Sequence, residues 1–257
     1  MSYHAVGEGK HMISIAFHIQ KGGTGKTTMS GNVGYAMSRH RRVLLVDADP
    51  QGNLSSWFLT ELRYELSDVL EDRVTLEEAV VEVRPNLDLL PTANVGNELR
   101  RWAEAHLVQK PYAFVDLIER VDYDVVVFDL GPGMSNLEQT ILAGVDEVVA
   151  VASAEFFSAD GIESFENELE RLRRDRRAQF RAEKLVINRF FRNFALHQVY
   201  TEQYEKMPYK LYRVGQSTAI ADCVPNRQTL FEYDPGNRYT TEIERIAADI
   251  LEVGVHA

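Results

Sequence analysis

Short apolar runs rich in β-branched residues alternate with helical patterns along the chain from Met12 onward. Such runs are typical of strands that are buried on both faces. The predicted strands are Ile13–Ile19, Val43–Val46, Leu87–Leu90, Val125–Phe128, Val148–Val151 and Leu185–Ile187. Apolar residues at helical spacing between them predict helices over Thr27–Ser38, Leu76–Val83, Asn97–His106, Pro111–Arg120, Asn136–Ala143, Ile162–Phe180 and Ala195–Glu205.

This alternation predicts an α/β fold. Strands separated by helices form βα units, and right-handed crossovers make such a sheet doubly wound and mostly parallel, with helices on both faces. The chain has no internal repeat and no long linker, so we expect one domain over residues 12–257. The helix-rich stretch from about Trp57 to Arg84 is expected to form an excursion over the sheet edge. Residues 1–11 are polar and are expected to be an N-terminal extension or a cloning remnant.

The most specific motif lies between the first predicted strand and the first predicted helix. It reads Ile19-Gln20-Lys21-Gly22-Gly23-Thr24-Gly25-Lys26-Thr27-Thr28. Glycines let backbone N–H groups turn inward around a phosphate, and the helix start adds its positive end. Lys26 can reach the β- and γ-phosphates, and the Thr27 hydroxyl can bind Mg²⁺.

The motif therefore predicts a phosphate-binding loop that belongs to a P-loop NTPase fold. The expected nucleotide-binding residues are Lys21, Gly22, Gly23, Thr24, Gly25, Lys26, Thr27 and Thr28. The ordinary pattern begins with glycine, whereas Gln20 stands there and a second lysine follows at Lys21. A glycine-rich turn with chance lysines is the alternative, which the flanking strand and helix disfavour.

Polar residues follow three of the predicted strands. Asp129 emerges where open α/β sheets bind their ligands, and we expect it to hold Mg²⁺ through water. Asp47 follows another strand, where a turn or helix-capping carboxylate is the alternative to a catalytic one. Asp49 precedes Pro50, so a turn and a Mg²⁺ contact are equally expected. Asn188 has a donor and an acceptor that suit adenine, and a turn-forming asparagine is the alternative.

The lysine arrangement resembles the deviant Walker A motif of the ParA/MinD family of dimeric P-loop ATPases. Further segments that resemble this family are Val43–Ser55, Tyr123–Asp129 and Leu230–Pro235. The succession of Leu66–Leu70, Leu76–Val83 and Asn86–Thr92 resembles the ParA branch in particular. The resemblance covers most of the chain from Met12. It implies a ParA-type ATPase that uses ATP and Mg²⁺. Only 19 residues precede Gln20, so we expect the small form without an N-terminal helix-turn-helix domain.

The resemblance also assigns roles to individual residues. Lys21 would reach across a homodimer interface to the partner's phosphates, and Asp47 would polarise the attacking water. With Lys26, these are the expected catalytic residues. Asn188 would read the edge of adenine. ATP would then close a sandwich dimer that binds nonspecific DNA, and a ParB-like adaptor would stimulate hydrolysis.

The chain departs from the family at two places. Many members continue after the Asp129 position with Thr-Pro-Pro, whereas this chain reads Leu130-Gly131-Pro132-Gly133. A segment that is rich in arginine in ParA proteins carries Gln216 and Ala219 instead. The expected DNA-binding residues are therefore the neighbouring arginines, Arg189, Arg192, Arg213 and Arg227. The basic run Arg171–Arg181 is the reserve, but six acidic residues lie near it.

Composition narrows the remaining function classes. The formal charge of −11 over 257 residues argues against a protein that coats nucleic acid with its whole surface, although a local basic patch stays possible. A single cysteine, Cys223, excludes an intramolecular disulfide and a cysteine-rich metal site. No signal core or run of ~20 apolar residues is present, so we expect a cytoplasmic protein that does not bind a membrane. A scaffold role that positions a protein assembly is the alternative to DNA segregation.

Overall fold

The computed structural model describes residues 12–153, 159–190, 205 and 207–253. Residues 1–11, Arg192 and nearly all of the helix predicted over Ala195–Glu205 lie outside the described residues.

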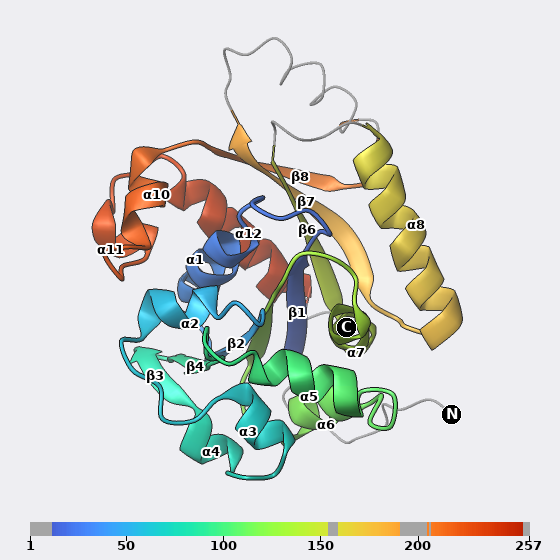
Figure 1. Cartoon of the computed structure of the whole chain (residues 1–257). Helices are drawn as coiled ribbons and strands as arrows, with labels where there is room; N and C mark the ends of the chain where they lie inside the picture. The colour runs from blue at the N-terminus through green and yellow to red at the C-terminus, as the bar shows by residue number, and fades with distance from the viewer. Residues whose placement is uncertain (1–11, 154–158, 191–204, 206, 254–257) are drawn as a thin grey trace.

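One eight-stranded sheet forms the centre of the molecule, in the order β3-β4-β2-β5-β1-β6-β7-β8 (Figure 1). The strands are β1 Ile13–His18, β2 Val43–Ala48, β3 Val81–Arg84, β4 Leu87–Leu90, β5 Val125–Leu130, β6 Glu147–Ser153, β7 Arg181–Phe190 and β8 Lys210–Gly215. Every neighbouring pair is parallel except β3 with β4. The predicted mostly parallel sheet is confirmed.

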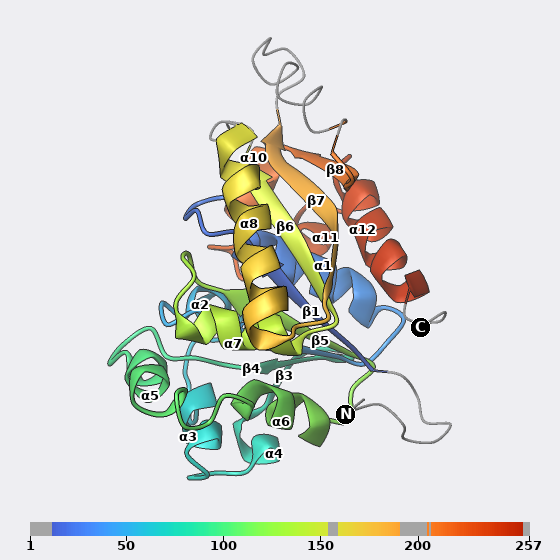
Figure 2. The ribbon, with the colours of Figure 1, turned by 90° about the vertical axis from the view of Figure 1, so that its right-hand side faces the viewer.

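Helices cover both faces of this sheet (Figure 2). They are α1 Lys26–Ser38, α2 Asn53–Phe58, α3 Leu66–Leu70, α4 Leu76–Ala79, α5 Glu98–His106, α6 Ala113–Arg120, α7 Asn136–Gly144, α8 Ala159–Arg176, α10 Thr218–Cys223, α11 Leu230–Tyr233 and α12 Thr240–Val253. Alternate strand residues face opposite layers. Ile15 and Val127 pack in the layer of α1 and α12, whereas Ala16 and Val126 pack in the layer of α5 to α8.

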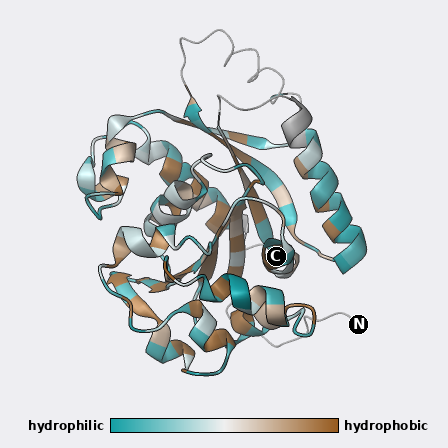
Figure 3. Ribbon diagram, viewed as in Figure 1, coloured by the Kyte–Doolittle hydropathy of each residue, from teal (hydrophilic) through white to brown (hydrophobic). Residues whose placement is uncertain are grey.

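Hydrophobic residues concentrate in the strands of the sheet (Figure 3). On α12, Ile243, Ile246 and Ile250 are fully buried against the sheet. The outer face of α8 is polar. Among the described helices, none combines the length and the apolar character needed to span a membrane.

The predicted helix over Leu76–Val83 is wrong in its second half. A capping box between Thr75 and Glu78 starts α4, which ends at Ala79. The following residues form β3, which pairs antiparallel with β4 through a turn that contains Asn86 at φ 60°. The alternation of Val81-Glu82-Val83-Arg84 suits a strand, and β4 provides the free edge that it needs.

The end of helix α8 and the presence of strand β8 also differ from the prediction. Helix α8 ends at Arg176 because Arg177 adopts a left-handed conformation, so the helix does not reach Phe180. Strand β8 was not predicted, because polar residues interrupt its apolar positions and only Tyr212, Val214 and Gly215 are buried. This half-exposed pattern follows from its place at the sheet edge.

A buried ion pair joins β6 to β7. Lys184 Nζ lies 2.5 Å from Glu147 Oε1, and the two side chains are only 5% and 1% exposed. Removing one partner leaves the other charge buried and unpaired, so we expect Lys184→Met to lower the free energy of unfolding by about 3–5 kcal/mol in urea titrations. The double variant Lys184→Met/Glu147→Leu should recover most of this loss. A single variant as stable as the parent would show that the charge pair is not needed.

Candidate functional site

The loop between β1 and α1 is shaped for close approach to an anion. Gly23 and Gly25 have φ of +74° and +97°, values that favour glycine. Helix α1 begins directly after Gly25, with no side-chain hydrogen bond capping its N-terminus. The first N–H groups of α1 therefore stay available to a ligand, and the positive end of the helix favours a negative one.

The two lysines of the loop lie in different environments. Lys26 is buried, and its Nζ donates to the Lys21 carbonyl oxygen over 3.1 Å, whereas Lys21 is exposed. Burial lowers the pKa of Lys26, and the charges of Asp129, Asp49 and Glu138 oppose this shift. Lys26 is thus held over its own loop among carboxylates.

Asp129 ends β5 beside Asp47, its register partner on β2. Its Oδ1 accepts a hydrogen bond of 2.9 Å from Ser30, whereas its buried Oδ2 has no hydrogen-bond partner within the described part of the chain. Burial raises the pKa of Asp129 to about 7, and hydrogen bonds from Thr27 and Ser30 oppose the rise. An unsatisfied carboxylate oxygen beside a threonine hydroxyl fits Mg²⁺, which prefers oxygen ligands. The predicted metal residues, Thr27 and Asp129, therefore come together.

Asp47 is fully buried at the end of β2. Its Oδ2 accepts hydrogen bonds from the backbone N–H and the hydroxyl of Ser55, at 2.7 and 2.6 Å. Burial and the neighbouring charge of Asp129 raise the pKa of Asp47 well above its usual value, and the Ser55 hydrogen bonds oppose the rise. Asp49 accepts from the Gln51 N–H and also faces the cavity, so its turn role is confirmed and a metal contact stays a prediction.

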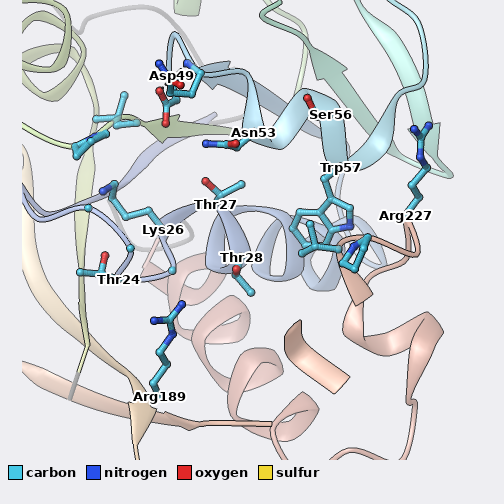
Figure 4. A pocket seen from close by; sticks show the side chains of 18 residues that line it. Thr24, Lys26, Thr27, Thr28, Asp49, Asn53, Ser56, Trp57, Arg189 and Arg227 are labelled. Atoms are coloured by element: carbon cyan, nitrogen blue, oxygen red, sulfur yellow. Dashed lines mark hydrogen bonds between the residues drawn. The ribbon is translucent and has the colours of Figure 1, made fainter. Parts of the chain in front are cut away.

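A cavity of about 610 Å³ opens over the loop. This volume lies within the usual range of small-molecule sites. Thr27 and Asn53 face one another across it, and Arg189 reaches toward the loop from β7 (Figure 4). Its walls are Gly22, Gly23, Thr24, Gly25, Lys26, Thr27, Thr28, Asp49, Gln51, Asn53, Ser56, Trp57, Leu130, Pro132, Arg189, Val224, Pro225 and Arg227.

Asn188, on β7, is hydrogen-bonded to the phosphate loop. Its Nδ2 donates to the Thr24 carbonyl oxygen over 2.8 Å, and its Oδ1 accepts from the Arg189 N–H over 2.9 Å. Both ends of the amide are therefore engaged within the chain. The expected contact between Asn188 and adenine stays a prediction, and it would compete with the hydrogen bond to Thr24.

The segment Leu130–Gly133, where the chain departs from the family pattern, forms a tight turn beside the phosphate loop. The Gly133 N–H donates to the Gln20 carbonyl oxygen over 2.8 Å, and Gly133 has a φ of +100°. Leu130 and Pro132 of the same segment line the cavity.

A family model described as an AAA domain matches residues 12–182, which include this turn and the loop.

Two proteins are similar to this chain over most of its length. The chain is 34% identical over 241 residues to protein BBD21 of Borreliella burgdorferi, with 91% of this chain and 98% of that protein covered. It is 30% identical over 197 residues to the chromosome partitioning protein ParA of Caulobacter vibrioides, with 72% of each chain covered. The chain belongs to the family of ParA-type P-loop ATPases.

A solved structure shares the fold of this ParA-type chain. It is a protein of Borrelia burgdorferi B31 described as a plasmid partition protein, bound to AMPPNP. The TM-score is 0.80 at 20% identity, and the match covers 94% of this chain and 99% of that one.

The described arginines among those expected to bind DNA have different surroundings in the ParA-type fold. Arg189 and Arg227 line the nucleotide cavity. Arg213 pairs with Glu205 at 2.5 Å, and Arg192 lies outside the described residues. In the reserve helix α8, acidic neighbours pair with Arg171, Arg173 and Arg174. DNA binding by these arginines stays a prediction.

Three residues of the site were not assigned from the sequence. Ser30 bonds to Asp129, Ser55 bonds to Asp47, and Trp57 donates from its indole to the Gln228 carbonyl oxygen over 3.0 Å. Ser30 could have been found, because it lies one helical turn after Lys26 and Thr27 and so shares their face. No sequence signal links Trp57 to Gln228, which lies 171 residues away.

Gly25 provides a test of the loop. A Cβ at this position would lie 2.0 Å from Asn188 Nδ2, and the φ of +97° adds backbone strain. We expect Gly25→Ala to weaken the affinity for a fluorescent ATP analogue by about 5- to 150-fold, as strain of 1–3 kcal/mol implies. Gly236→Ala is the control, since no described atom lies within 4 Å of the added Cβ. Unchanged affinity of Gly25→Ala would contradict the loop geometry.

Proposed function

We propose that this ParA-type chain is a partition ATPase that drives the segregation of a plasmid or a chromosome. The observation that carries the proposal is a cavity lined by Lys26 and Thr27, both of which interact with the buried carboxylate of Asp129, the register partner of Asp47. A phosphate loop, a metal site and a second carboxylate are the components that ATP hydrolysis needs.

Each residue then has a defined task. Lys26 and the N–H groups of the loop bind the terminal phosphates of ATP, and Thr27 and Asp129 hold the Mg²⁺ that neutralises their charge. Asp47 orients the attacking water through Oδ1, the carboxylate oxygen that Ser55 does not bond. The segment Leu130–Gly133 closes the phosphate end of the site.

Lys21 gives the site its dependence on a second copy of the chain. It is exposed and directly precedes Gly22 and Gly23, which line the cavity. A lysine before the loop serves the γ-phosphate of a facing subunit more easily than its own. An ATP-dependent sandwich homodimer is therefore proposed, and ADP would not hold it because the γ-phosphate is missing.

Nonspecific DNA and a ParB-like adaptor are the proposed partners of the dimer, which would place the ATP form on the nucleoid. The names of the relatives support this part, since they include a chromosome partitioning protein and a plasmid partition protein. A dimer doubles any basic patch, which raises the number of phosphate contacts and the counterions released. Arg213 is the candidate outside the nucleotide cavity.

A second candidate function is the positioning of a protein assembly by the same nucleotide switch. The observation in its favour is the neutralised basic surface. Glu205 pairs with Arg213, acidic residues pair with three arginines of α8, and Gln216 and Ala219 replace arginines of the ParA pattern.

Asp47→Ala tests the catalytic assignment. We expect hydrolysis to fall by at least about a hundredfold, because the water loses its orienting carboxylate while the phosphate-binding lysines remain. The variant should form a long-lived dimer on size-exclusion chromatography with Mg²⁺ and ATP. Asp88→Ala on β4 is the control and should leave hydrolysis unchanged, since Asp88 bonds Tyr123 away from the cavity. An active, monomeric Asp47→Ala variant would exclude Asp47 from catalysis.

DNA retention separates the two candidate functions. Random-sequence DNA should be retarded with ATP but not with ADP, and retention should weaken steeply as salt increases. Arg213→Glu should reduce retention without changing dimerisation. Arg101→Glu is the control, because Arg101 is also exposed and paired with an acid, but it lies on α5. If the parent ATP dimer showed no DNA affinity even at low salt, the positioning function would be favoured.

A further inference from the structure

Ser55 holds one oxygen of Asp47 from two directions. Its backbone N–H and its hydroxyl both donate to Oδ2, at 2.7 and 2.6 Å. From the described part of the chain, the other oxygen, Oδ1, accepts one longer hydrogen bond of 3.3 Å, from the Asp49 N–H. Oδ2 is therefore strongly hydrogen-bonded, whereas Oδ1 can accept a further hydrogen bond.

Thr92 fixes the orientation of the Ser55 hydroxyl. The Thr92 N–H donates to Ser55 Oγ over 2.8 Å, which occupies a lone pair and directs the hydroxyl hydrogen toward Asp47. The Thr92 hydroxyl donates to the Asp47 carbonyl oxygen over 2.6 Å. Ser55 and Thr92 are 2% and 1% exposed, so water does not compete for these bonds.

Thr92 is itself anchored from the opposite side. The Ala93 N–H donates to the buried carboxylate of Glu65 over 2.6 Å, and the Leu66 N–H donates to the Pro91 carbonyl oxygen over 2.7 Å. Gly52 packs against the same segment so closely that a Cβ there would lie 2.6 Å from the Thr92 carbonyl oxygen. The loop after β4 is thus rigidly placed against the end of β2.

We infer that Ser55 and Thr92 are positioning residues that hold the Asp47 carboxylate in the orientation that hydrolysis requires. The inference rests on the proposed catalytic role of Asp47. A side chain whose rotamer is fixed by neighbouring hydrogen bonds keeps its reacting atom in place, and small misplacements cost large factors in rate. Asp47, Ser55 and Thr92 all lie behind the residues that line the cavity, and Ser55 and Thr92 are placed to act through their hydrogen bonds to Asp47.

The test is a double-mutant cycle between Ser55→Ala and Asp47→Ala, measured as single-turnover hydrolysis of ATP. We expect Ser55→Ala to lower the rate by about ten- to a hundredfold. Its affinity for a fluorescent ATP analogue should stay within twofold of the parent. In the Asp47→Ala background, Ser55→Ala should have no further effect, because the group that it orients is already missing. A general structural defect would lower affinity and add to the effect of Asp47→Ala.

Matched variants control for the loss of a buried hydroxyl. Ser38→Ala removes a buried helical serine hydroxyl that bonds the Tyr35 carbonyl oxygen, far from Asp47 in α1, and should leave the rate unchanged. Ser55→Thr retains the hydroxyl and should restore the rate to within about threefold of the parent. If Ser55→Ala failed to fold, Thr92→Val would remove the hydroxyl that holds the Asp47 carbonyl oxygen and should lower the rate without lowering affinity.

The outcomes separate the inference from the proposed function. A slow Asp47→Ala variant with a Ser55→Ala variant at the parent rate would overturn the positioning role alone. Additive losses in the double variant would also overturn it. An Asp47→Ala variant at the parent rate would overturn the catalytic assignment on which the inference rests.

Discussion

Two carboxylates, Asp47 and Asp129, are buried side by side at the carboxyl edge of the sheet, and the site depends on how their charge is compensated. Burial raises the pKa of both groups, whereas hydrogen bonds from Ser55 to Asp47 and from Thr27 and Ser30 to Asp129 stabilise the charged forms. Lys26 supplies a nearby positive charge at the cost of its own desolvation. Such a site favours a divalent cation together with a polyphosphate. The cation compensates the negative charge of the carboxylates, and the polyphosphate compensates the positive charge of the cation and of Lys26.

The two-layered core explains how this costly arrangement stays in place. Strands β2, β5 and β1 lie at the centre of the sheet and are buried throughout, with apolar side chains packed on both faces. Their ends therefore cannot shift independently. The loop after β1 and the carboxylates near the ends of β2 and β5 meet because parallel strands end at the same edge.

The far wall of the cavity is connected to the segment that follows Asp47. Trp57 of α2 holds the Gln228 carbonyl oxygen, and Arg84 of β3 donates to the Arg227 carbonyl oxygen over 2.8 Å while pairing with Glu232. The chain from Val224 to Gln228 is thereby tied to α2. This explains why Arg227, one of the arginines expected to bind DNA, lines the cavity over the phosphate loop.

Local pattern was enough to predict the phosphate loop, the strand ends that carry Asp47 and Asp129, and the mostly parallel sheet, because each depends on residues close in sequence. The glycines must stand beside Lys26, and an apolar run must precede each carboxylate. Tertiary structure alone decided the rest. Strand β3 formed because β4 offered an edge, and Arg189 and Arg227 line the cavity over the phosphate loop because β7 and the segment after α10 converge there. The hydrogen bonds from Thr92 to Ser55 and from Ser55 to Asp47 join segments 37 and 8 residues apart, and only the packing of the loop after β4 against the end of β2 brings them together.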